Sequence, residues 1–313
     1  MSKTNSGLTE LLRLKGNGDA MGATFSIVLY GNDRAKMEAA LDAAFDEAGR
    51  LDGMLSNYRA ESEWSEVNRR AAEEPVKVSV ELFQLLSACA AYSRESEGAF
   101  DITVGPLMKL WGFYKGSGRL PNREDVAAAL PKVGYRHVRL DAASRTVWFD
   151  RSGVELDPGG IGKGYAVDRM VDVLRRQGFQ IALVAASDSS IYGMGAPPTE
   201  PKGWRVGIKE PRNPRRTVDE VFLKDMSIST SGSYQKYFLA EGRRYAHIMD
   251  PRTGYPAQGS VSVSVIAPRA IDSEAWASPY FVNGRQWAAR RKPTEFRVFF
   301  CEDGTEQPCA WLP

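Results

Sequence analysis

A glycine-rich turn ahead of an amphipathic helix, in residues 156–168, is the first place where the sequence predicts chemistry. Glycines before a helix let the backbone approach a ligand and leave N–H groups free to bind an anion, above all phosphate. Lys163 adds a positive charge there, and Asp157 adds a carboxylate. The glycine spacing fits neither a Walker loop nor the dinucleotide fingerprint. A tight strand-to-helix turn with a surface lysine is the structural alternative, and the local residues leave both open.

A second candidate is a pair of oxygen ligands, Glu274 and Ser278. They are four residues apart in an expected helix, so both side chains share one face. A carboxylate and a hydroxyl, with backbone carbonyls and water, suit Mg²⁺. The alternative is a carboxylate that favours the helix dipole near its N-terminus, a role that Asp272 would serve better. The local residues do not decide between these two explanations.

A third candidate is His247, one of two histidines in the chain. It precedes a proline-led turn that contains Asp250 and ends at Gly254. Histidine has the intrinsic pKa of a base that works near neutrality, although a structural histidine beside a turn explains the pattern as well. The adjacent hydroxyls of Thr230 and Ser231 precede a glycine, and there a turn with local hydrogen bonds is the alternative.

Strands and helices mix along the chain without strict alternation, which predicts an α+β fold rather than a doubly wound sheet. A long helix is expected from an Asp33 cap through about Met54. A polar link is expected over 56–68, and a surface loop over 210–216. Other helices are expected over 79–97, 107–113, 123–130, the segment after the glycine turn, and 272–291 with an interruption at Pro279. Strands are expected at Val154 and Leu156 and over 25–30, 138–140, 146–149, 181–185, 191–194, 204–208, 221–223, 227–230, 261–266, 296–300 and 310–312.

Composition narrows the possible functions. The 313 residues are 43% hydrophobic and 26% charged, with a net charge of +2, which gives no electrostatic case for nucleic acid or an anionic membrane. No apolar run is long enough for a transmembrane helix and no signal peptide is visible, so a cytoplasmic protein is expected. The spacing of Cys89, Cys301 and Cys309 indicates neither a metal cluster nor a disulfide framework. We expect residues 1–20 to be a flexible segment and 21–313 to form the domain.

Several motifs in order give the chain a family resemblance. They occupy residues 21–24 (Met-Gly-Ala-Thr), 56–58 (Ser-Asn-Tyr), 99–107, 110–113 (Leu-Trp-Gly-Phe), 157–168, 230–232 and 247–254. This series, from about residue 20 to 300, resembles the ApbE family, the FAD:protein FMN transferases. The resemblance implies an α+β ApbE-like fold with mixed sheets, packed helices and an FAD site in a cleft between two lobes.

The resemblance also implies an activity and a set of site residues. Such enzymes use Mg²⁺ and FAD, transfer the FMN moiety to a threonine or serine hydroxyl of an acceptor flavoprotein, and release AMP. A flavoprotein with a Ser/Thr-Gly-Ala-Thr-like segment would indicate an acceptor. His247 and Asp250 lie in the region that matches the catalytic motif. The FAD-contacting positions match Met21, Tyr58, Ala99, Phe100, Asp101, Asp157, Lys163 and Ile248, and the metal positions match Gly160 (through its backbone), Glu274 and Ser278.

The chain departs from the family pattern at the metal positions. The family usually has Asp and Thr where Glu274 and Ser278 stand, and Ala is common where Pro279 follows. Both changes keep oxygen ligands, but Glu reaches one methylene further and Mg²⁺ is strict about geometry. The altered metal helix makes a non-catalytic FAD-binding protein an alternative hypothesis. A second alternative is a Mg²⁺-dependent FAD pyrophosphatase, in which water replaces the acceptor hydroxyl.

Overall fold

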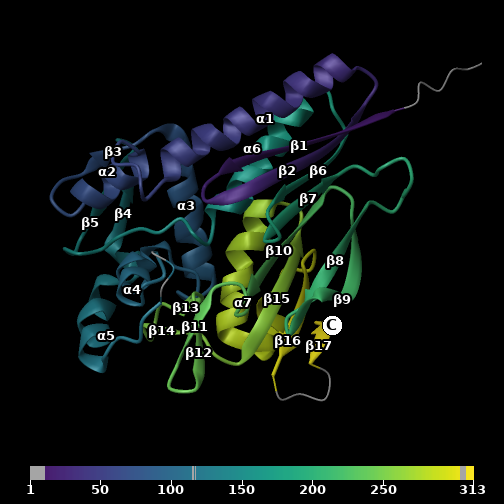
Figure 1. Cartoon of the computed structure of the whole chain (residues 1–313). Helices are drawn as coiled ribbons and strands as arrows, with labels where there is room; N and C mark the ends of the chain where they lie inside the picture. Colours follow the sequence, from purple (N-terminus) through teal and green to yellow (C-terminus); the bar gives the residue numbers. More distant parts are fainter. Residues whose placement is uncertain (1–10, 115, 117, 304–307) are drawn as a thin grey trace, which may run out of the picture.

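The largest element of the fold is an antiparallel sheet. The computed structural model describes residues 11–114, 116, 118–303 and 308–313. Within them, the sheet has eight strands (Figure 1). Their order is β1 (Leu12–Ala20), β2 (Ala23–Gly31), β6 (Ile181–Ala186), β7 (Ser190–Met194), β10 (Met226–Gly232), β15 (Ser260–Ala267), β16 (Arg297–Glu302) and β17 (Cys309–Trp311). Because strands alternate with helices irregularly along the chain, the α+β prediction is confirmed.

Three helices cover one face of this sheet, namely α1 (Arg34–Leu55), α6 (Gly162–Arg176) and α7 (Ala270–Arg291). The Asp33 carboxylate caps α1 by accepting the Lys36 N–H at 3.2 Å, as predicted. Apolar residues at helical spacing in α1, such as Met37 and Leu41, bury against strand residues such as Phe25 in one core. The sheet and these helices form the frame on which the site is built.

A two-stranded hairpin, β8 (Trp204–Glu210) and β9 (Asn213–Leu223), contributes a second core. Its Ile208 and Leu223 pack with Ile228 of β10 and Ile266 of β15. The prediction of a surface loop over 210–216 was wrong. Glu210 pairs with Asn213, and the exposed residues that follow Asn213 already belong to β9. Only a tight turn separates β8 from β9.

The second part of the fold is mainly helical (Figure 1). It contains α2 (Glu63–Arg70), α3 (Val80–Glu95), α4 (Gly105–Leu110), α5 (Arg123–Ala129), the 3-10 helices η1 (Ile102–Val104), η2 (Leu130–Lys132) and η3 (Tyr135–His137), and a small sheet of β3 (Val76–Lys77), β5 (Thr146–Phe149) and β4 (Val138–Asp141). The short pairs β11 (Tyr237–Ala240) with β12 (Arg243–Ala246) and β13 (Met249–Asp250) with β14 (Tyr255–Pro256) complete the elements. The 138–149 hairpin is confirmed, but the link over 56–68 already includes the start of α2, which Ser62 caps.

Three further expectations differ from the structure. Residues 12–20, expected to be flexible, form β1, which pairs with β2 along its whole length. Residues 154–158 join no sheet; Trp64 and Asn68 donate to the Leu156 carbonyl instead. The helix over 270–291 continues through Pro279, and its non-helical residue is Gly284, at φ 78° and ψ 175°. Glycine adopts that backbone conformation at no steric cost.

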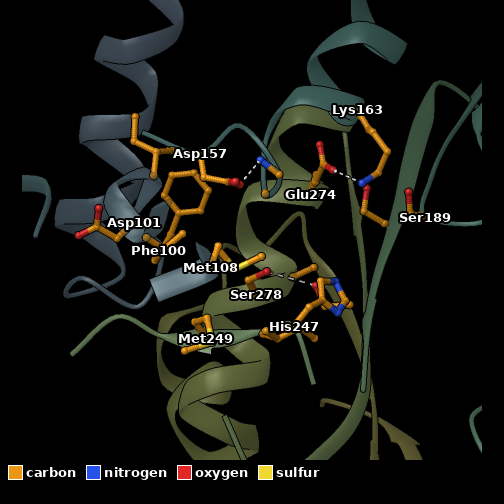
Figure 2. Close-up of a pocket in the computed structure, with 18 of the residues that line it drawn as sticks. Phe100, Asp101, Met108, Asp157, Lys163, Ser189, His247, Met249, Glu274 and Ser278 are labelled. Atoms are coloured by element: carbon orange, nitrogen blue, oxygen red, sulfur yellow. Dashed lines mark hydrogen bonds and ion pairs between the residues drawn. The ribbon is translucent and has the colours of Figure 1, made fainter. Parts of the chain in front are cut away.

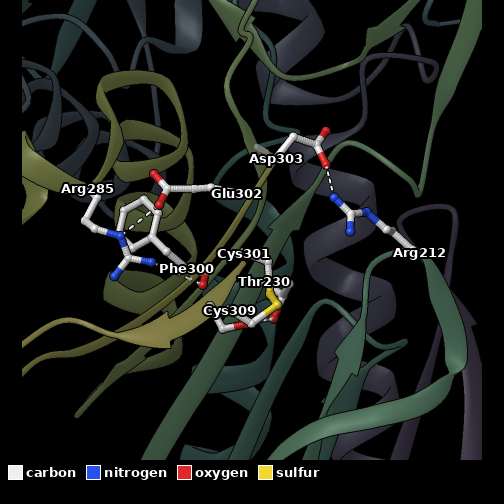
Figure 3. The surroundings of a disulfide bond; sticks show 9 residues. Arg212, Thr230, Arg285, Phe300, Cys301, Glu302, Asp303 and Cys309 are labelled. Atoms are coloured by element: carbon white, nitrogen blue, oxygen red, sulfur yellow. Dashed lines mark hydrogen bonds and ion pairs between the residues drawn. A yellow bond between two sulfur atoms is a disulfide. The ribbon is translucent and has the colours of Figure 1, made fainter. Parts of the chain in front are cut away.

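A disulfide joins Cys301 of β16 to Cys309 of β17, so the expectation of no disulfide was wrong (Figure 3). The two residues are directly opposite in the antiparallel register, with Cα atoms 4.1 Å apart. Nothing in the sequence spacing reveals this pairing, which depends on the strand register. Beside it, Arg285 of α7 donates to Glu302 at 2.8 Å. Across the described ranges, no helix has the length and apolar character needed to cross a membrane.

Candidate active site

A cavity of about 150 Å³ lies where the sheet part and the helical part meet (Figure 2). Most of the predicted site residues line it: Ala99, Phe100, Asp101, Asp157, Gly160, Lys163, His247, Ile248, Glu274 and Ser278. The hydroxyl-bearing residues Thr230 and Ser231 of β10 line it too. Residues that are far apart in the sequence are thus brought together, as a binding site requires.

The glycine turn presents the N-terminus of α6 to this cavity. The Asp157 carboxylate accepts the Gly159 N–H at 2.7 Å and so shapes the turn. The N-cap residue of α6, Ile161, provides no side-chain cap, and the Glu274 carboxylate accepts the Gly164 N–H of the first turn. A helix N-terminus carries partial positive charge and binds anions. Lys163, in the first turn of α6, adds a full positive charge to the same wall.

Glu274 lies opposite this turn and is buried. One carboxylate oxygen accepts the Gly164 N–H, and the other is 3.6 Å from Lys163 Nζ. Burial raises the pKa of Glu274, although Lys163 acts against that shift. A Cβ on Gly164 would be 2.3 Å from the Ala270 carbonyl oxygen. Position 164 must therefore be glycine for α6 and α7 to approach each other and place this carboxylate.

Asp168 is a positioning residue that the sequence analysis did not identify. Its carboxylate accepts N–H groups from Ala270 at 2.7 Å and Ile271 at 2.9 Å, so it caps α7 from the neighbouring helix. Burial raises the pKa of Asp168 to about 6. Asp272 instead accepts the Tyr92 hydroxyl and does not line the cavity. The cap role considered for Asp272 or Glu274 thus belongs to Asp168, which leaves Glu274 facing the cavity.

Serine hydroxyls line the same cavity as Glu274. Ser278 Oγ, one turn further along α7, is 3.3 Å from Ser231 Oγ of β10. Among the residues that the structure describes, no group of three or more His, Cys, Asp or Glu side chains gathers to hold a metal. The candidate donors here are one carboxylate, hydroxyls and the Gly160 carbonyl, and such hard oxygen donors fit Mg²⁺.

His247 follows β12 and lines the same cavity (Figure 2). Its Nδ1 is 3.1 Å from the backbone oxygen of Lys236. A carbonyl only accepts, so Nδ1 carries the proton and Nε2 keeps its lone pair. Burial lowers the pKa of His247 to about 4, so the ring is neutral at pH 7 and able to accept a proton.

We expect this low pKa of His247 to be measurable by NMR. Because burial favours the neutral ring, its imidazole signals should titrate with a pKa of about 4 in the protein without ligand. The same shift makes stability fall as pH drops from 6.5 toward 4, because only the unfolded chain binds the proton there. His137→Gln leaves a single histidine and assigns the signals. A pKa of 6.5 or higher would contradict the neutral ring.

Three predicted site residues lie outside the cavity. Met21, at φ 54° in the β1–β2 turn, lines an adjoining groove, and its N–H donates to Asp52. Tyr58 is 78% exposed, and its ring centroid is 6.3 Å from that of Tyr114. The Asp250 carboxylate accepts from Arg252 at 2.9 and 3.0 Å within its own turn. Met21 and Tyr58 remain accessible to a ligand that extends out of the cavity, whereas Asp250 is already paired.

Asp101 lines the cavity, but its carboxylate binds the protein itself. It accepts from the backbone and hydroxyl of Thr103 at 2.8 and 2.6 Å, and from the Tyr135 N–H at 2.6 Å. These bonds cap η1 and fix the loop that carries Phe100. Asp101 therefore positions this wall of the cavity.

This fold has close counterparts among solved structures. The apbe protein of Thermotoga maritima superposes with a TM-score of 0.85 at 31% identity, covering 96% of both chains. The flavinyl transferase ApbE of Pseudomonas stutzeri gives 0.84 at 30% identity, covering 97% of this chain and 95% of that one. The architecture is therefore that of flavin transferases.

Sequence comparisons agree with the structural ones. The ApbE family profile matches residues 21–299. An FAD:protein FMN transferase of Klebsiella pneumoniae is 34% identical over 286 residues, which cover 90% of this chain and 86% of that protein. A protein of the same name from Treponema pallidum is 33% identical over 264 residues, with 80% and 73% covered. The chain belongs to the ApbE family.

Proposed function

We propose that this chain is an FAD:protein FMN transferase. An acceptor serine or threonine hydroxyl attacks the FMN phosphorus of FAD, a new P–O bond forms, and the bridging bond of the pyrophosphate breaks to release AMP. The observation that carries the proposal is one cavity that brings together the N-terminus of α6, Lys163, the buried carboxylate of Glu274 and the neutral His247. A pyrophosphate needs the cationic wall, and hydroxyl activation needs the base.

The cavity accounts for part of FAD only. Its volume of about 150 Å³ is below the roughly 300–1,000 Å³ of pockets for drug-sized ligands. The rest of the dinucleotide must therefore extend outward, where Met21 and Tyr58 offer an apolar and an aromatic surface. This supports the roles predicted for these two residues outside the cavity.

His247 has the geometry and charge state of the base. Its Nε2 lone pair takes the proton of the acceptor hydroxyl, while the Lys236 carbonyl holds the ring through Nδ1. The Lys163 ammonium and the first turn of α6 hold the phosphate charge. Asp250 is assigned no proton transfer, because Arg252 already binds its carboxylate.

Glu274, Ser278 and the Gly160 carbonyl would hold Mg²⁺, since they supply oxygen donors in one cavity. When bound, the cation neutralises phosphate charge in the transition state.

One incubation separates the proposal from its alternatives. The protein is mixed with FAD, Mg²⁺ and an acceptor flavoprotein that contains a Ser/Thr-Gly-Ala-Thr-like segment. Covalent flavin fluorescence on the acceptor band after denaturing electrophoresis supports the transferase. Free FMN and AMP alone identify a pyrophosphatase, and unchanged FAD identifies a binding protein without this activity.

Charge reversal at Lys163 is expected to weaken FAD binding about 10- to 100-fold, because a hydrogen bond to a charged group contributes about 1.5–3 kcal/mol. Calorimetry with FAD measures the effect. Lys77→Glu, on the exposed strand β3, is the matched control and should bind FAD normally. Equal affinities for Lys163→Glu and the unmodified protein would remove Lys163 from the site.

A further inference from the structure

The backbone oxygen of Lys236 makes two contacts with one residue. The His247 backbone N–H donates to it at 3.0 Å, and the ring Nδ1 of His247 is 3.1 Å from the same oxygen. Two hydrogen bonds to one acceptor fix the ring relative to its own backbone, and they leave Nε2 as the free ring nitrogen. The position of the imidazole therefore depends on what holds residue 236 in place.

The Lys236 side chain ties this residue to the helical part of the fold. Lys236 lies between β10 and β11, and its Nζ donates to the backbone oxygen of Phe113, just beyond α4. That oxygen is on a fixed stretch of backbone, because Phe113 is 2% exposed and its N–H donates to the Met108 carbonyl at 2.9 Å. A hydrogen bond from a charged group contributes about 1.5–3 kcal/mol. The ammonium is therefore an effective anchor between the two parts.

Phe113 also contacts the histidine through its ring. The ring centroids of Phe113 and His247 are 6.5 Å apart at an interplanar angle of 70°, an edge-to-face arrangement. Met249, two residues after His247, packs with Phe113 in one core cluster. Desolvation lowers the pKa of His247 most, and the positive charges of Lys163 and Lys236 lower it further, so both ammonium groups lie near the ring. The helical part thus contacts the histidine directly, and through Lys236 it also holds the oxygen to which the ring is bonded.

We propose that Lys236 is a positioning residue, whose ammonium holds the His247 imidazole in place for proton transfer by anchoring residue 236 to the Phe113 carbonyl. The inference rests on the proposed function, in which Nε2 of His247 takes the proton of the acceptor hydroxyl. Lys236 does not line the cavity, so its effect on the reaction passes through the ring. Proton transfer depends on hydrogen-bond geometry, and a displacement of about 1 Å can cost about 10²-fold in rate. Loss of the anchor should therefore slow the chemical step.

Three lysine variants test the anchor. Lys236→Met keeps the apolar stem and removes the ammonium, so the single-turnover rate of flavin transfer from bound FAD to an acceptor flavoprotein should fall about tenfold or more. The FAD dissociation constant from calorimetry should stay unchanged. Lys236→Arg keeps a charged donor and should recover most of the rate. Lys202→Met is the matched control, because that ammonium lies over the Phe222 ring, 5.6 Å from its centroid, and outside the cavity. It should keep the full rate.

A double-mutant cycle shows whether Lys236 acts through His247. In a His247→Ala background, Lys236→Met should cause no further loss of rate, because residues that act as a unit are not additive. A second tenfold loss in that background overturns the inference, as does a full rate for Lys236→Met alone. A loss of FAD affinity in Lys236→Met also overturns it, because Lys236 then holds the substrate.

The ring itself gives a readout that needs neither FAD nor an acceptor. Nitrogen NMR shifts of His247 should show the Nδ1–H tautomer in the unmodified protein and less of it in Lys236→Met. An unchanged tautomer population overturns the inference. If Lys236→Met fails to fold, Lys236→Ser, at an exposed position and too short to reach the carbonyl, replaces it with the same expected results. Failure of the unmodified protein to transfer flavin contradicts the proposed function instead, so the two failures are distinguishable.

Discussion

Glu274→Gln is expected to lower flavin transfer at saturating FAD by about 10²-fold or more, with partial recovery at high Mg²⁺. The amide keeps the size of the side chain and can still accept the Gly164 N–H, but it loses the charge that holds a hard cation. Metal stabilisation of transition-state charge contributes several kcal/mol, and about 1.4 kcal/mol is a tenfold change in rate. Initial rates over a Mg²⁺ titration measure the effect.

Two variants of the same helix serve as controls. Glu274→Asp restores the usual family residue and should retain or raise activity. Asp272→Asn should change little, since that carboxylate binds Tyr92 away from the cavity. A glutamine variant equal to the unmodified enzyme, with Asp272→Asn inactive, would move the metal ligand to Asp272. If neither substitution matters, the metal role of this helix is wrong.

His247→Ala is expected to slow transfer by about 10²-fold or more while leaving FAD affinity near normal, because general-base catalysis contributes about 10²- to 10⁴-fold. Its Nδ1–H is held by the Lys236 carbonyl, so the ring is oriented for the reaction by the protein itself. Single-turnover rates with pre-bound FAD separate the chemical step from binding.

His137→Ala is the matched control, since that ring pairs with Asp150 at 2.8 Å, outside the cavity. It should keep the full transfer rate. If His247→Ala instead loses FAD affinity in step with activity, His247 holds substrate or structure. The base must then be sought among the remaining oxygen groups, with Asp250 disfavoured by its pairing with Arg252.

Local patterns in the sequence predicted the elements that carry the site. The Asp33 cap and the apolar stripe of α1 depend on neighbours within a few residues, and the structure confirms both. The glycine turn predicted a helix start, and α6 begins there at Gly162. The family resemblance predicted that one site would contain His247, Glu274 and Asp157, and all three line the cavity. Spacing alone says nothing about contacts between distant segments.

The features that sequence reasoning missed depend on contacts and strand pairings that the local sequence does not show. Asp168 caps a helix about a hundred residues later in the chain, so no local pattern marks it. The Cys301–Cys309 bond follows from two strands that place those residues opposite each other. The β8–β9 hairpin was hidden because prolines and arginines near its tip are typical of a surface loop.

The cavity walls come from both parts of the fold, with Phe100 on the helical side and Glu274 on the sheet side. A ligand that binds both walls stabilises the folded state in which the two parts are in contact. At a hundredfold excess over its dissociation constant, it stabilises the folded state by about 2.7 kcal/mol. That free energy is lost whenever the two parts separate, together with the core packing that joins Phe25 and Met37 to Leu82 and Val147 in one cluster. Occupancy by substrate thus strengthens a coupling between the two parts that their shared core already provides.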